Sequence, residues 1–142
     1  MSIQSTTNIG TANLRQTLFD ALSRSTKDIA WYSGNNPYLF RVNGRESYVY
    51  IRNVHASGKN RHNQDECRLQ FSSSTAFSEA QDSGLPILFL GYFHDEQVFT
   101  AWDPSIQRQR INEKENVSVY SRFSKQLEAN RFGIALYIDR EG

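Results

Sequence analysis

The chain has 142 residues, which fits one domain, and its 38% hydrophobic and 22% charged residues are ordinary for a soluble globular protein. The formal net charge of only +1 does not by itself indicate a nucleic-acid binder. No apolar run approaches the roughly 20 residues that span a bilayer, no signal core is visible, and the single cysteine cannot form an internal disulfide, so a soluble cytoplasmic protein is expected.

The first part of the chain predicts one helix followed by strands. Leu14, Leu18 and Leu22 recur at every fourth position, which predicts a helix over residues 11–24 that precedes a core at about residues 29–138. Runs rich in aromatic and β-branched residues predict three strands, at residues 29–33, 38–42 and 48–54. Asn43-Gly44 between the last two predicts a hairpin, because both residues tolerate positive φ.

The rest of the core predicts further strands and two short helices. The expected strands are residues 66–71, 87–93, 98–102, 117–120 and 134–138, and the expected helices are residues 74–82 and 121–131. Strands 87–93 and 98–102 are expected to be central. Cys67 shares a strand face with Leu69 and Phe71, which favours a buried structural thiol over a nucleophile. Strands and helices do not alternate regularly, and no glycine-rich phosphate loop is visible, which excludes a doubly wound nucleotide-binding sheet.

Two polar segments are the strongest functional signal. Residues 55–65 (HASGKNRHNQD) and 105–116 (SIQRQRINEKEN) contain almost no large apolar side chain, and Asp103-Pro104 is interpreted as a break before the second. Loops of this length are uncommon in compact domains unless they bind something. Their arginine, lysine and amide side chains are the groups that contact phosphates and read base edges. The sequence therefore predicts two exposed arms that bind DNA.

Catalytic and metal sites are weighed against this prediction. His55, His62 and Cys67 match no zinc-ligand spacing. Asp103 and Glu113 come closest to a magnesium-dependent nuclease site, but the order of acids and lysine is wrong. The expectation is therefore no catalytic site, no metal and no cofactor, with a small nuclease kept as the alternative from another functional class.

Three segments resemble a known family. The stretches DECRLQ at 65–70, GYFHDEQVFTAWDP at 91–104 and NVSVYSR at 116–122 resemble effector or specificity domains of restriction endonucleases, which share a pseudobarrel with the B-three DNA-binding domain of plant transcription factors. The resemblance implies an α+β, mainly β fold: an open seven-stranded pseudobarrel with two to three short helices. It also implies a single DNA-recognition domain over residues 1–142, whose nuclease domain lies elsewhere in the same polypeptide.

The resemblance implies that the two arms hold the major groove of double-stranded DNA. The residues expected to contact DNA are Lys59, Asn60, Arg61, His62 and Asn63 in the first arm, Gln107, Arg108, Gln109, Arg110 and Asn112 in the second, and Arg68, Ser121 and Arg122 beside them. Ser121 and Arg122 suit a phosphate anchor at a helix N-terminus. Arg68 could instead pair internally with Glu66 or Asp103. A methylcytosine reader is the alternative within the binding class; its base pocket would use Trp31, Tyr32 or Trp102, although these aromatics are more simply core.

Overall fold

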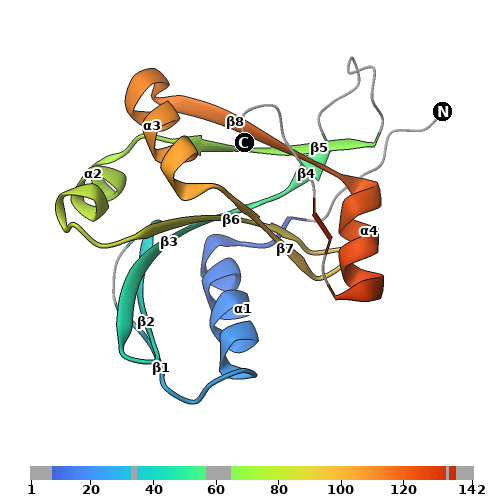
Figure 1. Cartoon of the computed structure of the whole chain (residues 1–142), viewed down its shortest axis with the longest axis horizontal. Helices are drawn as coiled ribbons and strands as arrows, with labels where there is room; N and C mark the ends of the chain where they lie inside the picture. The colour runs from blue at the N-terminus through green and yellow to red at the C-terminus, as the bar shows by residue number, and fades with distance from the viewer. Residues whose placement is uncertain (1–7, 33–34, 57–64, 134, 137–142) are drawn as a thin grey trace.

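The computed structural model describes residues 8–32, 35–56, 65–133 and 135–136, and this part of the chain contains four helices and eight strands (Figure 1). The helices are α1 (Thr11–Ser23), α2 (Thr75–Asp82), α3 (Pro104–Lys114) and α4 (Phe123–Phe132). The strands are β1 (Ile29–Trp31), β2 (Tyr38–Val42), β3 (Arg45–Asn53), β4 (His55–Ala56), β5 (Glu66–Ser72), β6 (Ile87–Phe93), β7 (Val98–Trp102) and β8 (Asn116–Arg122). None of the helices within these ranges is both long and apolar enough to cross a membrane.

A five-stranded sheet forms the middle layer, in the order β1-β2-β3-β6-β7. Its strands pair antiparallel except for β3 and β6, which run parallel. β2 and β3 form the predicted hairpin, and Asn43 and Gly44 at its turn have φ angles of 51° and 77°. Asparagine and glycine adopt such angles at small cost, so local chemistry fixes this hairpin.

A three-stranded antiparallel sheet, β4-β5-β8, covers one face of the five-stranded sheet. Only Val54 separates β3 from β4, so one segment of chain passes directly from the first sheet into the second. The predicted α+β, mainly β class is confirmed. The described strands form two sheets and no closed barrel, so their pairing does not show a seven-stranded pseudobarrel.

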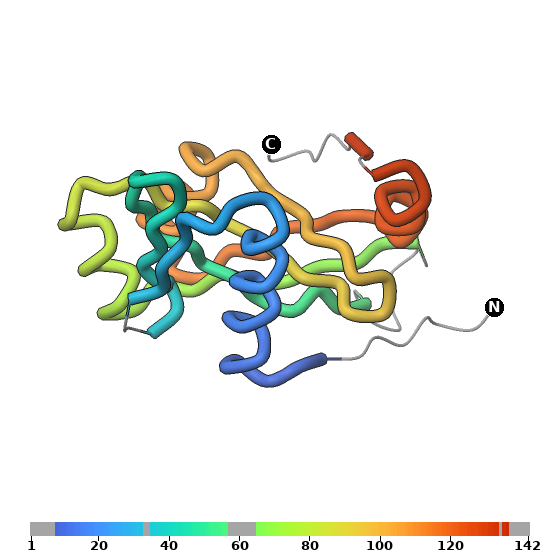
Figure 2. The backbone as a smooth tube through the Cα atoms, turned by 90° about the horizontal axis from the view of Figure 1, so that it is seen from below, coloured from blue at the N-terminus to red at the C-terminus, as the bar shows by residue number. Residues whose placement is uncertain are grey.

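Two apolar cores hold the layers together. The larger core fills the space between the sheets and includes Phe71 of β5, Phe89 of β6 and Trp102 of β7. The smaller core lies on the other face of the five-stranded sheet, where Leu14 and Leu18 of α1 pack. Figures 1 and 2 show α2 and α3 at one end of the layers and α4 at the other, with α1 beneath the five-stranded sheet. The helix over residues 11–24 is therefore an integral layer of the fold.

Most local predictions are confirmed. β2, β6 and β7 have the predicted bounds, and α1, α2 and β5 differ from theirs by one residue. Ser74 caps α2, because its Oγ accepts a hydrogen bond from the backbone N–H of Phe77 at 3.1 Å. Cys67, Leu69 and Phe71 are buried on one face of β5, as their alternation predicts.

Two predictions about elements need correction, and a third is mostly untested. β7 is an edge strand of its sheet rather than a central one, because no strand pairs with its outer edge among the described residues. The helix predicted from residue 121 begins at Phe123, because β8 continues as far as Arg122, which pairs in register with Glu66. The strand predicted at 134–138 falls mostly outside the described residues, and Ala135 and Leu136 belong to no strand.

Gly91 in β6 allows the two sheets to approach closely. A Cβ atom at this position would lie 2.6 Å from side-chain carbons of Leu69 and Val54 and 3.0 Å from Trp102. Because these neighbours are packed, we expect Gly91→Ala to lower the free energy of unfolding by about 1–3 kcal/mol in a urea titration. Leu88→Thr, at an exposed position of the same strand, is the control and should cost less than about 1 kcal/mol. Small and equal losses would show that the sheets can separate here at little cost.

Candidate nucleic-acid interface

The outer face of the three-stranded sheet carries polar and charged side chains from all three strands. Alternation in β5 and β8 buries every second side chain against the larger core and turns the others outward. The outward side chains are His55 from β4, Glu66, Arg68, Gln70 and Ser72 from β5, and Asn116, Ser118, Tyr120 and Arg122 from β8. We call this surface the outer face.

The register aligns these groups in rows across the strands. Arg68 lies opposite His55 on one side and Tyr120 on the other, and Glu66 lies opposite Arg122. Neighbouring strands are about 4.8 Å apart, so the groups of one row are within reach of a common ligand. Arg68 forms no hydrogen bond or ion pair within the described residues, so the internal pairing with Glu66 that the sequence left open is not made.

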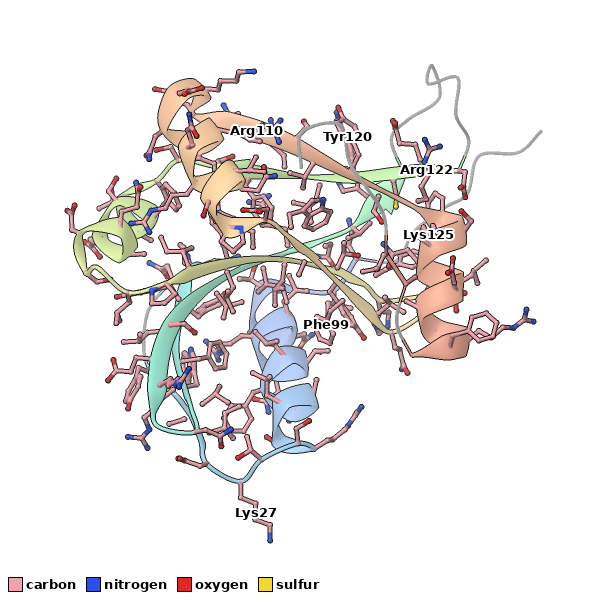
Figure 3. All side chains as sticks on the ribbon, viewed as in Figure 1. Lys27, Phe99, Arg110, Tyr120, Arg122 and Lys125 are labelled. Atoms are coloured by element: carbon pink, nitrogen blue, oxygen red, sulfur yellow. The ribbon has the colours of Figure 1, made fainter. Side chains whose placement is uncertain are left out.

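Positive groups continue from the outer face towards α3 and α4. Figure 3 shows Arg110, Tyr120, Arg122 and Lys125 on this side of the molecule, and Lys27 at the opposite end. Lys125 forms an ion pair with Glu128, 3.0 Å away on the next turn of α4. The outer face presents arginine, imidazole, phenol and amide groups beside the carboxylate of Glu66, and all but the carboxylate suit phosphates and bases.

The first predicted arm, residues 55–65, is only partly described. His55 and Ala56 form β4, and Asp65 leads into β5. The central residues Lys59, Asn60, Arg61, His62 and Asn63 lie outside the described residues. Their contact with DNA stays a prediction, while the strands on both sides of this segment belong to the sheet that carries the outer face.

The second predicted arm is wrong as an extended loop, because Pro104–Lys114 form the helix α3. Asp103 is its N-cap: its Oδ1 accepts hydrogen bonds from the backbone N–H groups of Ser105 at 2.9 Å and Ile106 at 3.2 Å. Proline loses no helical hydrogen bond at the first position, and its fixed φ suits a helix. Asp103-Pro104 therefore starts a helix, whereas from the sequence alone this pair is interpreted only as the end of the preceding strand.

Several polar side chains of α3 bind other parts of the protein. Gln107 is fully buried, and its Oε1 accepts a hydrogen bond of 2.8 Å from Arg110. Arg110 also donates to the backbone oxygen of Ser118 in β8 at 3.1 Å. Arg108 donates to the side-chain and backbone oxygens of Gln81 in α2 at 3.2 and 3.3 Å.

The remaining second-arm residues also have partners within the protein. Asn112 and Gln81 exchange two side-chain hydrogen bonds of 2.9 Å each. Gln109 donates to Glu113 at 3.3 Å on the surface of the helix. These contacts fasten α3 to α2 and β8, while Gln109 and Asn112 stay exposed on the helix. Contact of the second-arm residues with DNA stays a prediction.

The geometry expected for a phosphate anchor at residues 121–122 is wrong. Ser121 is buried in β8, 3% exposed, and its Oγ accepts a hydrogen bond from Gln126 at 3.0 Å. The N-terminus of α4 is already occupied by Asp65, whose carboxylate accepts from the backbone N–H of Ser124 at 2.9 Å and from its hydroxyl at 2.6 Å. A protein carboxylate thus takes the position that a phosphate would need.

The acids considered for a nuclease lie far apart. Asp103 and Glu113 are at opposite ends of α3, and ten residues at 1.5 Å rise separate them by about 15 Å, too far to share one ion. Across the ranges that the structure describes, no group of three or more His, Cys, Asp or Glu side chains could hold a metal ion. Burial raises the pKa of the Cys67 thiol to about 12, so this thiol stays protonated near neutral pH.

The aromatic residues considered for a base pocket belong to separate cores. Trp102 lies in the larger core, 6% exposed, and its Nε1 donates to the backbone oxygen of Tyr120 at 3.1 Å. Trp31 packs against the smaller core on the other side of the five-stranded sheet, with the guanidinium of Arg15 3.6 Å from its ring centroid. Tyr32 directly follows Trp31. The interpretation of Trp102 as a core residue is confirmed, and the two tryptophans cannot line one pocket.

Arg52 in β3 and Gln70 in β5 are polar residues of this region that the sequence interpretation does not assign. Arg52 has the parity of Tyr48 and Tyr50, which face the larger core, yet Arg52 is exposed. The sequence signal for this position is an arginine on the strand face that otherwise carries core residues. A charged side chain is rarely buried, so the core must end at this point and leave the arginine in contact with solvent.

The comparisons with known proteins identify a family. A family model described as Methylase-associated X1 matches residues 45–142, which is more than half of the chain. The match begins at the first residue of β3 and includes the strands that carry the outer face. No curated protein and no solved structure matches the chain. The chain therefore belongs to the Methylase-associated X1 family.

Proposed function

We propose that this domain binds double-stranded DNA sequence-specifically, as the recognition module of a restriction–modification system. The family name associates its members with methylases. The resemblance of segments 65–70, 91–104 and 116–122 to effector domains of restriction endonucleases points to the same context. The domain supplies recognition, and a methylase or nuclease in the same polypeptide or complex supplies the chemistry.

The observation that supports this proposal most directly is the outer face. β5 and β8 pair over seven residues each, and a two-stranded β ribbon is one of the elements that the major groove, about 12 Å wide, admits. Arg68 and Arg122 on this ribbon contact phosphates in the proposal. Residues 59–63 between β4 and β5 supply the amide and guanidinium groups that read base edges, in place of the second arm.

A binding titration tests the function. A duplex selected from a randomised pool should bind at least about a hundredfold more tightly than a random duplex in fluorescence anisotropy at fixed salt. For a handful of phosphate contacts, the slope of log K against log salt should be about −3 to −5. A flat salt dependence, or equal affinity for both duplexes, would remove sequence-specific DNA binding from consideration.

A further inference from the structure

A small polar pocket opens beside the outer face, between β3 and β5. Its volume is about 260 Å³. Arg52, His55, Arg68 and Gln70 contribute its polar lining, together with Asn8 and Asn53. Neither Arg122 nor any residue of α3 or α4 lines it, so the pocket is distinct from the β8 side of the interface.

The pocket exists because strand pairing along this edge of β5 is interrupted. β4 has two residues and pairs only with Cys67 and Arg68. Further along, the hydroxyl of Tyr50 accepts from the backbone N–H of Ser72 at 3.2 Å and donates to its carbonyl oxygen at 2.9 Å. Gln70 lies between the residues paired with β4 and Ser72, which is bonded to Tyr50. Because backbone N–H groups alternate between the edges of a strand, the N–H of Gln70 points to the same edge as that of Ser72, towards the pocket.

The charge of the pocket favours an anion. Arg52 and Arg68 both line it, and among the described residues no carboxylate does. Neither guanidinium forms a hydrogen bond or ion pair within the described residues. The two positive charges repel each other across the pocket, and a bound anion offsets this repulsion because it attracts both. Guanidinium groups and backbone N–H groups are the donors that phosphate oxygens prefer.

The wall of the pocket is held in place independently of any ligand. The side chain of Asn53 accepts from the backbone N–H of Ile9 at 3.1 Å and donates to its carbonyl oxygen at 2.9 Å. These two bonds fix the segment before α1 against β3. The backbone on this side of the pocket is therefore in place before an anion binds, which reduces the entropic cost of binding.

We propose that this pocket binds one phosphate group, and that the group is a backbone phosphate of the DNA duplex. The source of the phosphate rests on the proposed function, whereas the chemistry of the site rests on the pocket itself. A phosphate seated between β3 and β5 fixes the position of one DNA strand relative to the outer face and so sets the register in which residues 59–63 meet the bases.

The pocket is tested first with inorganic phosphate. In ¹H–¹⁵N spectra of the whole chain, phosphate should shift the backbone amide signal of Gln70, and Arg52→Gln should abolish the shift. Arg45→Gln is the matched control, since Arg45 is exposed on the same strand and does not line the pocket. No shift at Gln70, or a shift that persists in Arg52→Gln, overturns the site. A shift of similar size at many exposed basic residues indicates an adventitious ion only and also overturns it.

The source of the phosphate is tested with neutral methylphosphonate linkages placed one at a time along the selected duplex. One linkage should cost the wild-type protein about tenfold in affinity and Arg52→Gln less than about twofold. If the duplex binds but every linkage costs the wild-type protein and Arg52→Gln the same loss of affinity, DNA as the source of the phosphate is overturned. If inorganic phosphate binds and no duplex does, the proposed function and the DNA source fail together. If the duplex binds and inorganic phosphate does not, the pocket alone fails.

Discussion

Replacing Arg68 and Arg122 together by glutamine is expected to weaken binding to the selected duplex about a hundredfold at low salt. The two guanidinium groups lie on the same face of the paired strands β5 and β8. Each contacts one phosphate in the proposal, and the loss of one such contact near 0.05 M salt costs roughly tenfold. The slope of log K against log salt should become less negative by about 2. Random duplexes should lose affinity by a similar factor, because phosphate contacts carry little sequence information.

The matched control removes the same charge elsewhere. Arg24 and Lys27 follow α1, and Figure 3 shows Lys27 at the end of the molecule opposite Arg122. The double variant Arg24→Gln/Lys27→Gln should keep the salt slope of the wild type. If both double variants weaken binding equally, net charge alone governs the affinity and the outer face has no special role. Urea titrations of both proteins should show that each remains folded.

Arg110→Ala is expected to lower the free energy of unfolding by about 2–4 kcal/mol. Arg110 donates to Oε1 of the fully buried Gln107 at 2.8 Å and to the backbone oxygen of Ser118 at 3.1 Å. Truncation leaves both acceptors without this charged donor, and an unsatisfied buried acceptor costs roughly 1–3 kcal/mol. The ratio of affinities for selected and random duplexes should stay unchanged. Urea unfolding and anisotropy on the same preparation measure both quantities.

Gln109→Ala is the control for this variant. Gln109 is exposed on the same helix, and within the described part of the chain its side chain bonds only to Glu113, so its loss should change the stability by no more than about 0.5 kcal/mol. One outcome would contradict this structural role of Arg110. Unchanged stability in Arg110→Ala, with a loss of about 1–3 kcal/mol on the selected duplex alone, would mean that this arginine leaves its internal partners to read a base.

The exposure of individual side chains on α3 could not be predicted from local sequence alone. The polar composition of residues 105–116 predicts exposure, and most of α3 is exposed, yet Gln107 and Ile111 are buried one turn apart. Polar composition did not distinguish a capped helix that packs through two side chains from an extended arm. The Asp-Pro pair at its start is the local signal, and it indicates a helix only if proline is interpreted as the first helical residue.

What the sequence determined by itself is the set of elements governed by short-range chemistry. Alternation in β5, the continuous apolar run of β6, the Asn43-Gly44 turn and the Ser74 cap each depend on neighbours within a few residues, so their positions follow from the chain alone. Only the tertiary structure decided which strands meet. The parallel pairing of β3 with β6, the edge position of β7 and the gap between β3 and β5 depend on contacts between distant segments, because strand order is selected by burial of the whole core. That same long-range packing buries Gln107 and leaves Arg52 and Arg68 lining one pocket.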